Sequence, residues 1–296
     1  MGRNGLCVDA TFNPMENNKM ISAKIIADSV SEQGKRLTTL ELSYPRFIHG
    51  EIMTHRVFSR NAASSRAIPV KVMLDQVRNN PVIPIKWGSN QPGMQTGAEV
   101  EPAAQVEAET LWRQAAECAA DFAQELQDRN IHKSLANRIL EPFQWMKTTV
   151  TATEWDNFFE LRDHPDAEIH FQTLAKCMRQ AMAESTPVLR TFDPFQTASW
   201  HLPYVSVDER AEHSFLQLTK VSAARCARVS YLTHDGKQPD IEKDLALFDR
   251  LARGKPLHAS PLEHQATPSL PGRPCFSNLM GWIQYRKLVE EEMQNA

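Results

Sequence analysis

The chain has 296 residues, of which 42% are hydrophobic and 23% are charged, and its formal net charge is −3. This composition is that of an average soluble globular protein, and it argues against a membrane protein and against a basic surface that would attract a nucleic acid polymer. The five cysteines are widely spread without a Cys-x-x-Cys pair. We therefore expect reduced thiols that pack as small buried hydrophobes, and no metal site.

The first predicted elements form a hairpin followed by a helix. Residues 1–20 are polar and are expected to be a flexible lead-in. Two β-type runs over 22–30 and 36–42 flank a polar turn, which predicts an antiparallel hairpin. Pro45 then favours the start of a helix. Four apolar residues give that helix one stripe: Phe47, Ile48, Ile52 and Met53.

The middle and the end of the chain alternate loops and helices. Prolines and glycines make 79–102 a loop, and the pattern from Pro102 to Asn130 predicts a long amphipathic helix. The β-branched run Thr148–Thr151 favours a strand. Further helices are expected at about 135–140, 155–161, 168–182, 211–229, 239–253 and 277–292. With 186–210 as an ordered loop, the fold class is α+β, mostly helical with a small antiparallel sheet.

The segment Thr54–Arg66 carries the most chemical information. It holds three arginines, three serines, a histidine and an asparagine within thirteen residues. Arginine offers a planar fork of donors for phosphate, and serine hydroxyls and turn amides add neutral donors. This combination suits a nucleotide monophosphate or a dinucleotide cofactor. By composition alone, a solvated polar loop with capping serines is the commoner explanation.

The spacing of this segment matches a known signature. His55-Arg56-x-x-Ser59-x-Asn61-x-x-Ser64-x-Arg66 resembles the Arg-His-Arg-x-x-Ser-x-Asn-x-x-Ser-x-Arg signature of the flavin-dependent thymidylate synthases. Asn137–Pro142 resembles that family's Ala-Arg-x-x-Leu-Pro turn, and Asn157–Arg162 resembles its Asn-Phe-x-x-Leu-Arg segment.

Two further motifs stand in a swapped order. Ala224–Tyr231 and Leu257–His264 resemble the family's Ala-Ala-Arg-x-Ser and His-x-Ser-Pro-x-Glu-His blocks, which precede the arginine signature in the family and follow it here. We therefore expect a circularly permuted, divergent member. Its single catalytic domain would cover 21–296, with a signature block (36–185) and a second block (211–296). Permutation is tolerable when the original termini lie close together and the new ones open at a surface loop.

The resemblance implies a methyltransferase that carries a one-carbon unit from methylenetetrahydrofolate to C5 of dUMP, with FAD as cofactor and NADPH as reductant. It also implies a homotetramer whose active sites form between subunits. The start Met1–Gly5 lacks the apolar run of a secretory signal, so we expect a cytoplasmic enzyme.

Roles of single residues follow from the motif match. Ser64, Arg66 and Arg138 are expected at the dUMP phosphate, and Arg162 at the pyrimidine ring. The positions expected to line the flavin are His55, Ser59, Asn61, Asn157, His164 and His264.

Three of the matched residues are expected to act in catalysis: Arg56, Arg162 and Ser64. An arginine beside the flavin or the pyrimidine carbonyls would stabilise negative charge that develops there. Arg225 and Arg228 are expected instead to pair with carboxylates and hold a helix.

The chain departs from the family pattern at several positions. Thr54 replaces the first arginine of the signature, Ala67 stands where the family has tyrosine, and Glu141 separates Leu140 from Pro142. Three hypotheses stay open as a result. They are methylation of dUMP, a hydroxymethylase that forms 5-hydroxymethyl-dUMP or acts on dCMP, and a nucleotide-binding relative without catalysis.

Overall fold

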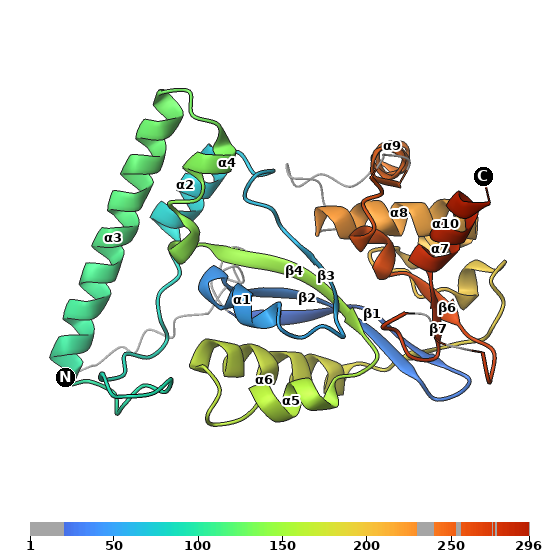
Figure 1. Cartoon of the computed structure of the whole chain (residues 1–296), viewed down its shortest axis with the longest axis horizontal. Coiled ribbons are helices and arrows are strands. Elements are labelled where there is room, and N and C mark those ends of the chain that lie inside the picture. The colour runs from blue at the N-terminus through green and yellow to red at the C-terminus, as the bar shows by residue number, and fades with distance from the viewer. Residues whose placement is uncertain (1–20, 230–239, 253–255, 274, 276, 296) are drawn as a thin grey trace, which may run out of the picture.

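The computed structural model describes residues 21–229, 240–252, 256–273, 275 and 277–295. The predicted lead-in over 1–20 and the end of the Ala224–Tyr231 motif therefore lie outside the described residues. The α+β fold class is confirmed, with helices around a small sheet (Figure 1).

The centre of the fold is a five-stranded sheet in the order β3-β4-β2-β1-β5. Its strands are β1 (Ser22–Ser31), β2 (Arg36–Pro45), β3 (Ser59–Ala62), β4 (Trp145–Ala152) and β5 (Val188–Arg190). The predicted hairpin is confirmed as β1–β2, and its turn contains Gly34 at a φ of +73°, a conformation that favours glycine. All pairings in this sheet are antiparallel except that of β5 with β1.

Helices cover the apolar face of this sheet. These helices are α5 (Asp156–Arg162) and α6 (Ile169–Glu184), and they lie below the sheet in Figure 1. The residues that face them alternate along β2 and β4, so Leu40, Leu42 and Val150 share one core with Phe171 and Leu174. This core is the largest of the described part of the chain.

The opposite face of the sheet is polar and packs against the C-terminal part of the chain. That part contains α7 (Val207–Glu212), α8 (Phe215–Arg228), α9 (Ile241–Ala252), η5 (Ser260–Glu263), α10 (Tyr285–Gln294) and a two-stranded sheet of β6 (Ala266–Pro268) and β7 (Trp282–Gln284). Thr39 and Thr151 on the sheet bond His201 and His264 from this part. The interface therefore depends on specific hydrogen bonds as well as on apolar burial.

A third group of helices stands at one end of the molecule, at the left of Figure 1. It comprises α2 (Val70–Asn79), α3 (Pro102–Asp128) and α4 (Lys133–Ala136). The long helix expected from Pro102 is confirmed as α3. Its alanines Ala116, Ala120 and Ala123 pack closely on Val70 and Leu74 of α2.

Buried ion pairs hold α8 and α9 of the second block together and join them to α7, which begins just before that block. Arg225 Nε lies 2.7 Å from Asp244 Oδ2, and Arg225 Nη2 lies 2.6 Å from Glu209 Oε1. Arg228 Nη1 lies 2.5 Å from Asp244 Oδ1. These pairs join α7, α8 and α9, which confirms that both arginines pair with carboxylates.

Several predicted elements differ from the structure. The helix expected at about 135–140 is the short α4, which ends at Ala136, and the helix expected from 211 begins at Phe215, after the end of α7. The helix after Pro45 is short, with η2 (Arg46–Ile48) followed by α1 (His49–Ile52). Its stripe is narrower than expected because Phe47 and Met53 are 40% and 47% exposed. The region 186–210 is not only loop, since it contains β5, η4 (Thr197–Ser199) and the start of α7. The last helix begins at Tyr285 rather than near Ser277, because β7 pairs with β6 immediately before it.

The cysteines agree only in part with the expectation. All four described cysteines are free thiols, and Cys226 is fully buried. Cys118 and Cys275 are exposed, so the prediction that every cysteine is a buried hydrophobe was wrong for these two. Cys7 lies outside the described residues.

Candidate functional site

A pocket of about 220 Å³ lies where β3 ends. Its lining residues are Arg46, Ala62, Ala63, Ser64, Ser65, Arg66, Arg138 and Met146. The structure thus brings together the three residues expected at a phosphate, Ser64, Arg66 and Arg138, although Arg138 is some seventy positions further along the chain. Serine hydroxyls and guanidinium groups around one hollow form a site for an oxyanion.

Hydrogen bonds to the backbone explain how this pocket is built. The chain turns after β3, where Ala67 N donates to Ser64 O at 2.9 Å. Buried Asn137 donates from Nδ2 to Ser65 O at 2.7 Å and to Ile68 O at 3.1 Å, which ties the end of α4 to this turn. Arg138 follows Asn137 directly and is therefore held beside the turn.

Arg46 completes the pocket and was not predicted. It follows the last residue of β2, and Pro45 pairs with Trp145 at the start of β4. Arg46 Nη2 donates to Glu141 Oε1 at 2.9 Å, and Arg138 Nη1 donates to the same oxygen at 3.0 Å. Glu141 itself is not a lining residue. The signal that would have revealed Arg46 is the pairing of β2 with β4, which no linear motif contains.

A second cluster forms around Arg162. Its Nε donates to His55 Nε2 at 3.0 Å, its Nη1 lies 3.1 Å from Glu51 Oε2, and its guanidinium carbon lies 4.6 Å from the centre of the Phe171 ring. Because Arg162 donates, His55 Nε2 must accept, and the neutral ring carries its proton on Nδ1. Burial and the charge of Arg162 lower the pKa of His55 to about 4. Arg162 is thereby held in one half-buried position.

Three predicted residues around this cluster are exposed. Arg56 follows His55, and Asn157 precedes Phe158, whose ring centre lies 4.9 Å from that of His55. His164 lies just beyond the end of α5, where its Nδ1 accepts from Asp166 N at 3.2 Å. Guanidinium, amide and imidazole groups offer donors to carbonyl and phosphate oxygens, so this donor set fits a cofactor such as a flavin nucleotide.

Three other predicted residues are buried between the sheet and the second block. Ser59, Asn61 and His264 are 1%, 8% and 0% exposed. Asn61 Nδ2 donates to Cys226 O at 3.2 Å, and Asn278 Nδ2 donates to Ser59 Oγ at 3.0 Å. The structure does not place them on the surface that carries Arg56 and Asn157.

His264 belongs to a buried chain of hydrogen bonds that the sequence did not reveal. Its Nδ1 lies 2.8 Å from Thr151 Oγ1, Thr151 Oγ1 lies 2.6 Å from Thr39 Oγ1, and Thr39 Oγ1 lies 2.8 Å from His201 Nε2. His201 Nδ1 then reaches Ser29 Oγ at 2.9 Å. Burial lowers the pKa of His264 to about 3 and the pKa of His201 well below its usual value. Both rings are therefore neutral at pH 7.

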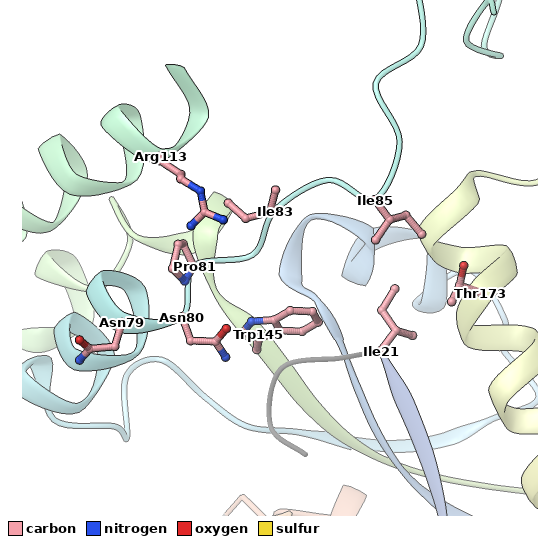
Figure 2. A pocket seen from close by; sticks show the side chains of 9 residues that line it. All are labelled: Ile21, Asn79, Asn80, Pro81, Ile83, Ile85, Arg113, Trp145 and Thr173. Carbon is pink, nitrogen blue, oxygen red and sulfur yellow. The ribbon is translucent and has the colours of Figure 1, made fainter. Parts of the chain in front are cut away.

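A larger pocket of about 360 Å³ lies near the start of β4 (Figure 2). Ile21, Ile85 and the Trp145 ring give it an apolar side, whereas Asn79 and Arg113 give it a polar side. None of the predicted site residues lines it. Within the described ranges of the chain, no group of three metal-ligating side chains is found. Among the described helices, none is long and apolar enough to cross a membrane.

Comparisons with known proteins add to this geometry. A family model described as "Thymidylate synthase complementing protein" matches residues 23–188, a range that contains the pocket at β3 and the Arg162 cluster. No curated protein matches the chain.

Two similar solved structures are of a UMP/dUMP methylase, PolB from Streptomyces cacaoi. The one bound with 5-Br UMP has 16% identity and a TM-score of 0.49, covering 57% of this chain and 90% of that chain. The one bound with 5-Br dUMP has 18% identity and a TM-score of 0.46, covering 57% of this chain and 91% of that chain.

Proposed function

Because the chain belongs to the thymidylate synthase complementing protein family, we propose that it transfers a one-carbon unit from methylenetetrahydrofolate to C5 of dUMP. The proposed enzyme is flavin-dependent, uses NADPH as reductant, and acts in the cytoplasm as a homotetramer. The observation that carries the proposal is the pocket at β3, which gathers Ser64, Arg66 and Arg138 with Arg46.

The nucleotide phosphate is assigned to this pocket. A phosphate monoester carries about −1.5 to −2 charges at pH 7, and it accepts several charge-assisted hydrogen bonds at once. Arg66 and Arg138 line the hollow and supply forks of donors, while Ser64 adds a hydroxyl. In this role the residues bind and orient the substrate so that its base is presented in one position.

The base and the flavin are assigned to the second cluster. Glu51 and His55 hold the Arg162 side chain in place, so its remaining N–H donors are already oriented before a ligand binds. Facing the pyrimidine carbonyls, Arg162 would stabilise negative charge that develops on the ring, and Arg56 would do the same beside the flavin. FAD, when bound, supplies the redox chemistry of the methylene transfer, and the exposed Arg56, Asn157 and His164 would hold it.

Within the described residues, no hydrogen bond or ion pair joins the Arg162 cluster to the pocket at β3. We propose that each complete active site combines groups from several copies of the chain. Buried Ser59, Asn61 and His264 would then support the site from behind by fixing β3 against the second block.

We also propose that the second block (211–296) is a permuted part of the same catalytic domain. Supporting this, η5 and α8 pack directly on β3, the strand that carries Ser59 and Asn61 of the signature. Segments that lie between about 150 and 200 positions apart in the chain are thus neighbours in space. The ion pair between Arg286 and Glu263 further joins α10 to η5.

The first test is the absorption spectrum of the purified protein, followed by the mass of the nucleotide formed with dUMP, methylenetetrahydrofolate and NADPH. We expect a flavin spectrum and a product heavier than dUMP by one methyl group. A product heavier by a hydroxymethyl group, or turnover of dCMP in place of dUMP, would replace the proposal by the hydroxymethylase hypothesis. A protein that takes up no added flavin and forms no product would reject both, and would favour the inactive relative that Thr54 suggests.

The second test concerns the pocket alone. Arg66→Ala is expected to weaken dUMP binding by about ten- to a hundredfold, because charge-assisted hydrogen bonds are worth about 1.5–3 kcal/mol. Binding of deoxyuridine, which lacks the phosphate, should change little. Isothermal titration with both ligands measures this, and Arg129→Ala, an exposed change at the C-terminal cap of α3 and outside the pocket lining, serves as the control. Equal losses for dUMP and deoxyuridine would remove the phosphate from this pocket.

A further inference from the structure

We propose that Glu141 is a positioning and specificity residue of the pocket at β3: by holding Arg46 and Arg138 and lowering the local charge, it selects nucleoside monophosphates over diphosphates. The inference rests on the proposed function in one respect, namely that a nucleotide phosphate binds there. It concerns Glu141, whose carboxylate touches two of the three arginines that line the pocket.

The geometry of Glu141 supports a positioning role. A single oxygen, Oε1, accepts from Arg46 Nη2 at 2.9 Å and from Arg138 Nη1 at 3.0 Å. Arg46 comes from the end of β2 and Arg138 from the turn after α4, so the shared carboxylate fixes two guanidinium groups from separate elements relative to each other. Since Glu141 does not line the pocket, it does this from behind and leaves the hollow open.

The backbone keeps that carboxylate in place. Glu141 begins the short helix η3 (Glu141–Phe143), in which Pro142 limits φ and Phe143 is 8% exposed. Glu141 N donates to Arg138 O at 3.3 Å, which closes the turn between the two residues. The motif that this turn resembles has proline directly after leucine, whereas Glu141 separates Leu140 from Pro142 here.

The charges of the pocket support a specificity role. Arg46, Arg66 and Arg138 each contribute one positive charge, and Glu141 removes one, which leaves a net charge of +2. This matches the charge of about −2 on a phosphate monoester. A diphosphate brings roughly one further negative charge. Among the described residues, the lining of the pocket contains no fourth cation, because Lys133, whose Nζ donates to Ala67 O at 2.9 Å, lies beside the turn and outside the lining. Glu141 would repel that added charge. Removing the carboxylate would therefore strengthen the binding of the diphosphate more than the binding of the monophosphate.

The test compares dUMP, dUDP and deoxyuridine by isothermal titration on the full chain. The wild-type protein is expected to prefer dUMP to dUDP, and Glu141→Gln, which keeps shape but removes charge, should reduce this preference about tenfold. Deoxyuridine binding should stay unchanged. Glu141→Asp retains the charge and should keep the preference within about threefold. Glu107→Gln on α3 makes the same charge change at an exposed position and should match the wild type.

The outcomes distinguish a failure of the role proposed for Glu141 from a failure of the proposed phosphate site. A dUMP-to-dUDP preference in Glu141→Gln within twofold of the wild type, with phosphate-dependent binding intact, would overturn the role of Glu141 alone. A similar loss of preference in Glu141→Asp would also overturn it, since charge would then not be the cause. Wild-type protein that binds dUMP no better than deoxyuridine would overturn both the role of Glu141 and the phosphate site.

Discussion

Arg225→Ala is expected to lower the free energy of unfolding by about 3–5 kcal/mol. Arg225 is 0% exposed and forms ion pairs with Glu209 and with Asp244, which is also 0% exposed. Without the guanidinium, Asp244 keeps a buried charge for which Arg228 is the one remaining ion-pair partner among the described residues, and α7 loses its ionic link to α9. Urea unfolding followed by circular dichroism measures the loss.

Two variants test the cause. Arg129→Ala removes an exposed ion pair with Glu125 and should cost less than about 0.5 kcal/mol. Arg225→Met combined with Asp244→Leu also removes the fully buried carboxylate and leaves unpaired only Glu209 and Arg228 of this network, whose side chains are 15% exposed, so it should recover part of the stability. If Arg225→Ala costs less than about 1 kcal/mol, the buried network is not what holds the second block together.

Acidification from pH 7 to pH 5 is expected to destabilise the fold by about 2 kcal/mol through His264, with a further loss through His201. The folded-state pKa of His264 is about 3, against an ordinary value of 6.5, and His201 shifts in the same direction. Below pH 6.5 these two imidazoles bind protons in the unfolded chain, whereas in the folded chain they stay neutral. The stabilisation is thus complete above the unfolded pKa and is lost as the pH falls towards the folded pKa.

The measurement is the free energy of unfolding in urea at several pH values between 7 and 5. His264→Gln removes one titrating ring and should reduce the loss of stability between pH 7 and pH 5 by about 2 kcal/mol. His164→Gln alters an exposed ring and should leave the slope as it is. An unchanged slope in His264→Gln would mean that this imidazole becomes protonated in the folded protein at the same pH as in the unfolded chain.

Local patterns predicted much of the fold. Alternation along the first two strands and the β-branched run in β4 are visible in the sequence, because successive residues of a strand face opposite sides of the sheet. The helical spacing of the apolar residues in α3 is equally clear in the sequence. The start of the last helix was misplaced because the residues before Tyr285 look amphipathic, yet Trp282 and Gln284 pair with β6. Tertiary pairing there outweighs local propensity.

The candidate site was predictable to the extent that a motif fixes it. The motif match alone predicts that Ser64, Arg66 and Arg138 lie at one phosphate, and all three line the pocket at β3. Arg46 could not be found, because its place depends on the pairing of β2 with β4. A motif also does not distinguish a residue that contacts a ligand from one that stabilises the surrounding structure. His264, which the motif places at the flavin, is buried and hydrogen-bonded to Thr151.

The polar interface between the sheet and the second block has a consequence for how the two parts find each other. Apolar surfaces can slide against one another at little cost, whereas Thr39 and Thr151 each offer one hydroxyl to one imidazole. A slip of the second block by one residue would present Val150 in place of Thr151, and it would leave His264 of that block without its hydrogen-bond partner in the interior. Such a loss costs about 1–3 kcal/mol per group. The second block therefore docks in a single register, and mis-registered assembly is penalised before any ligand binds.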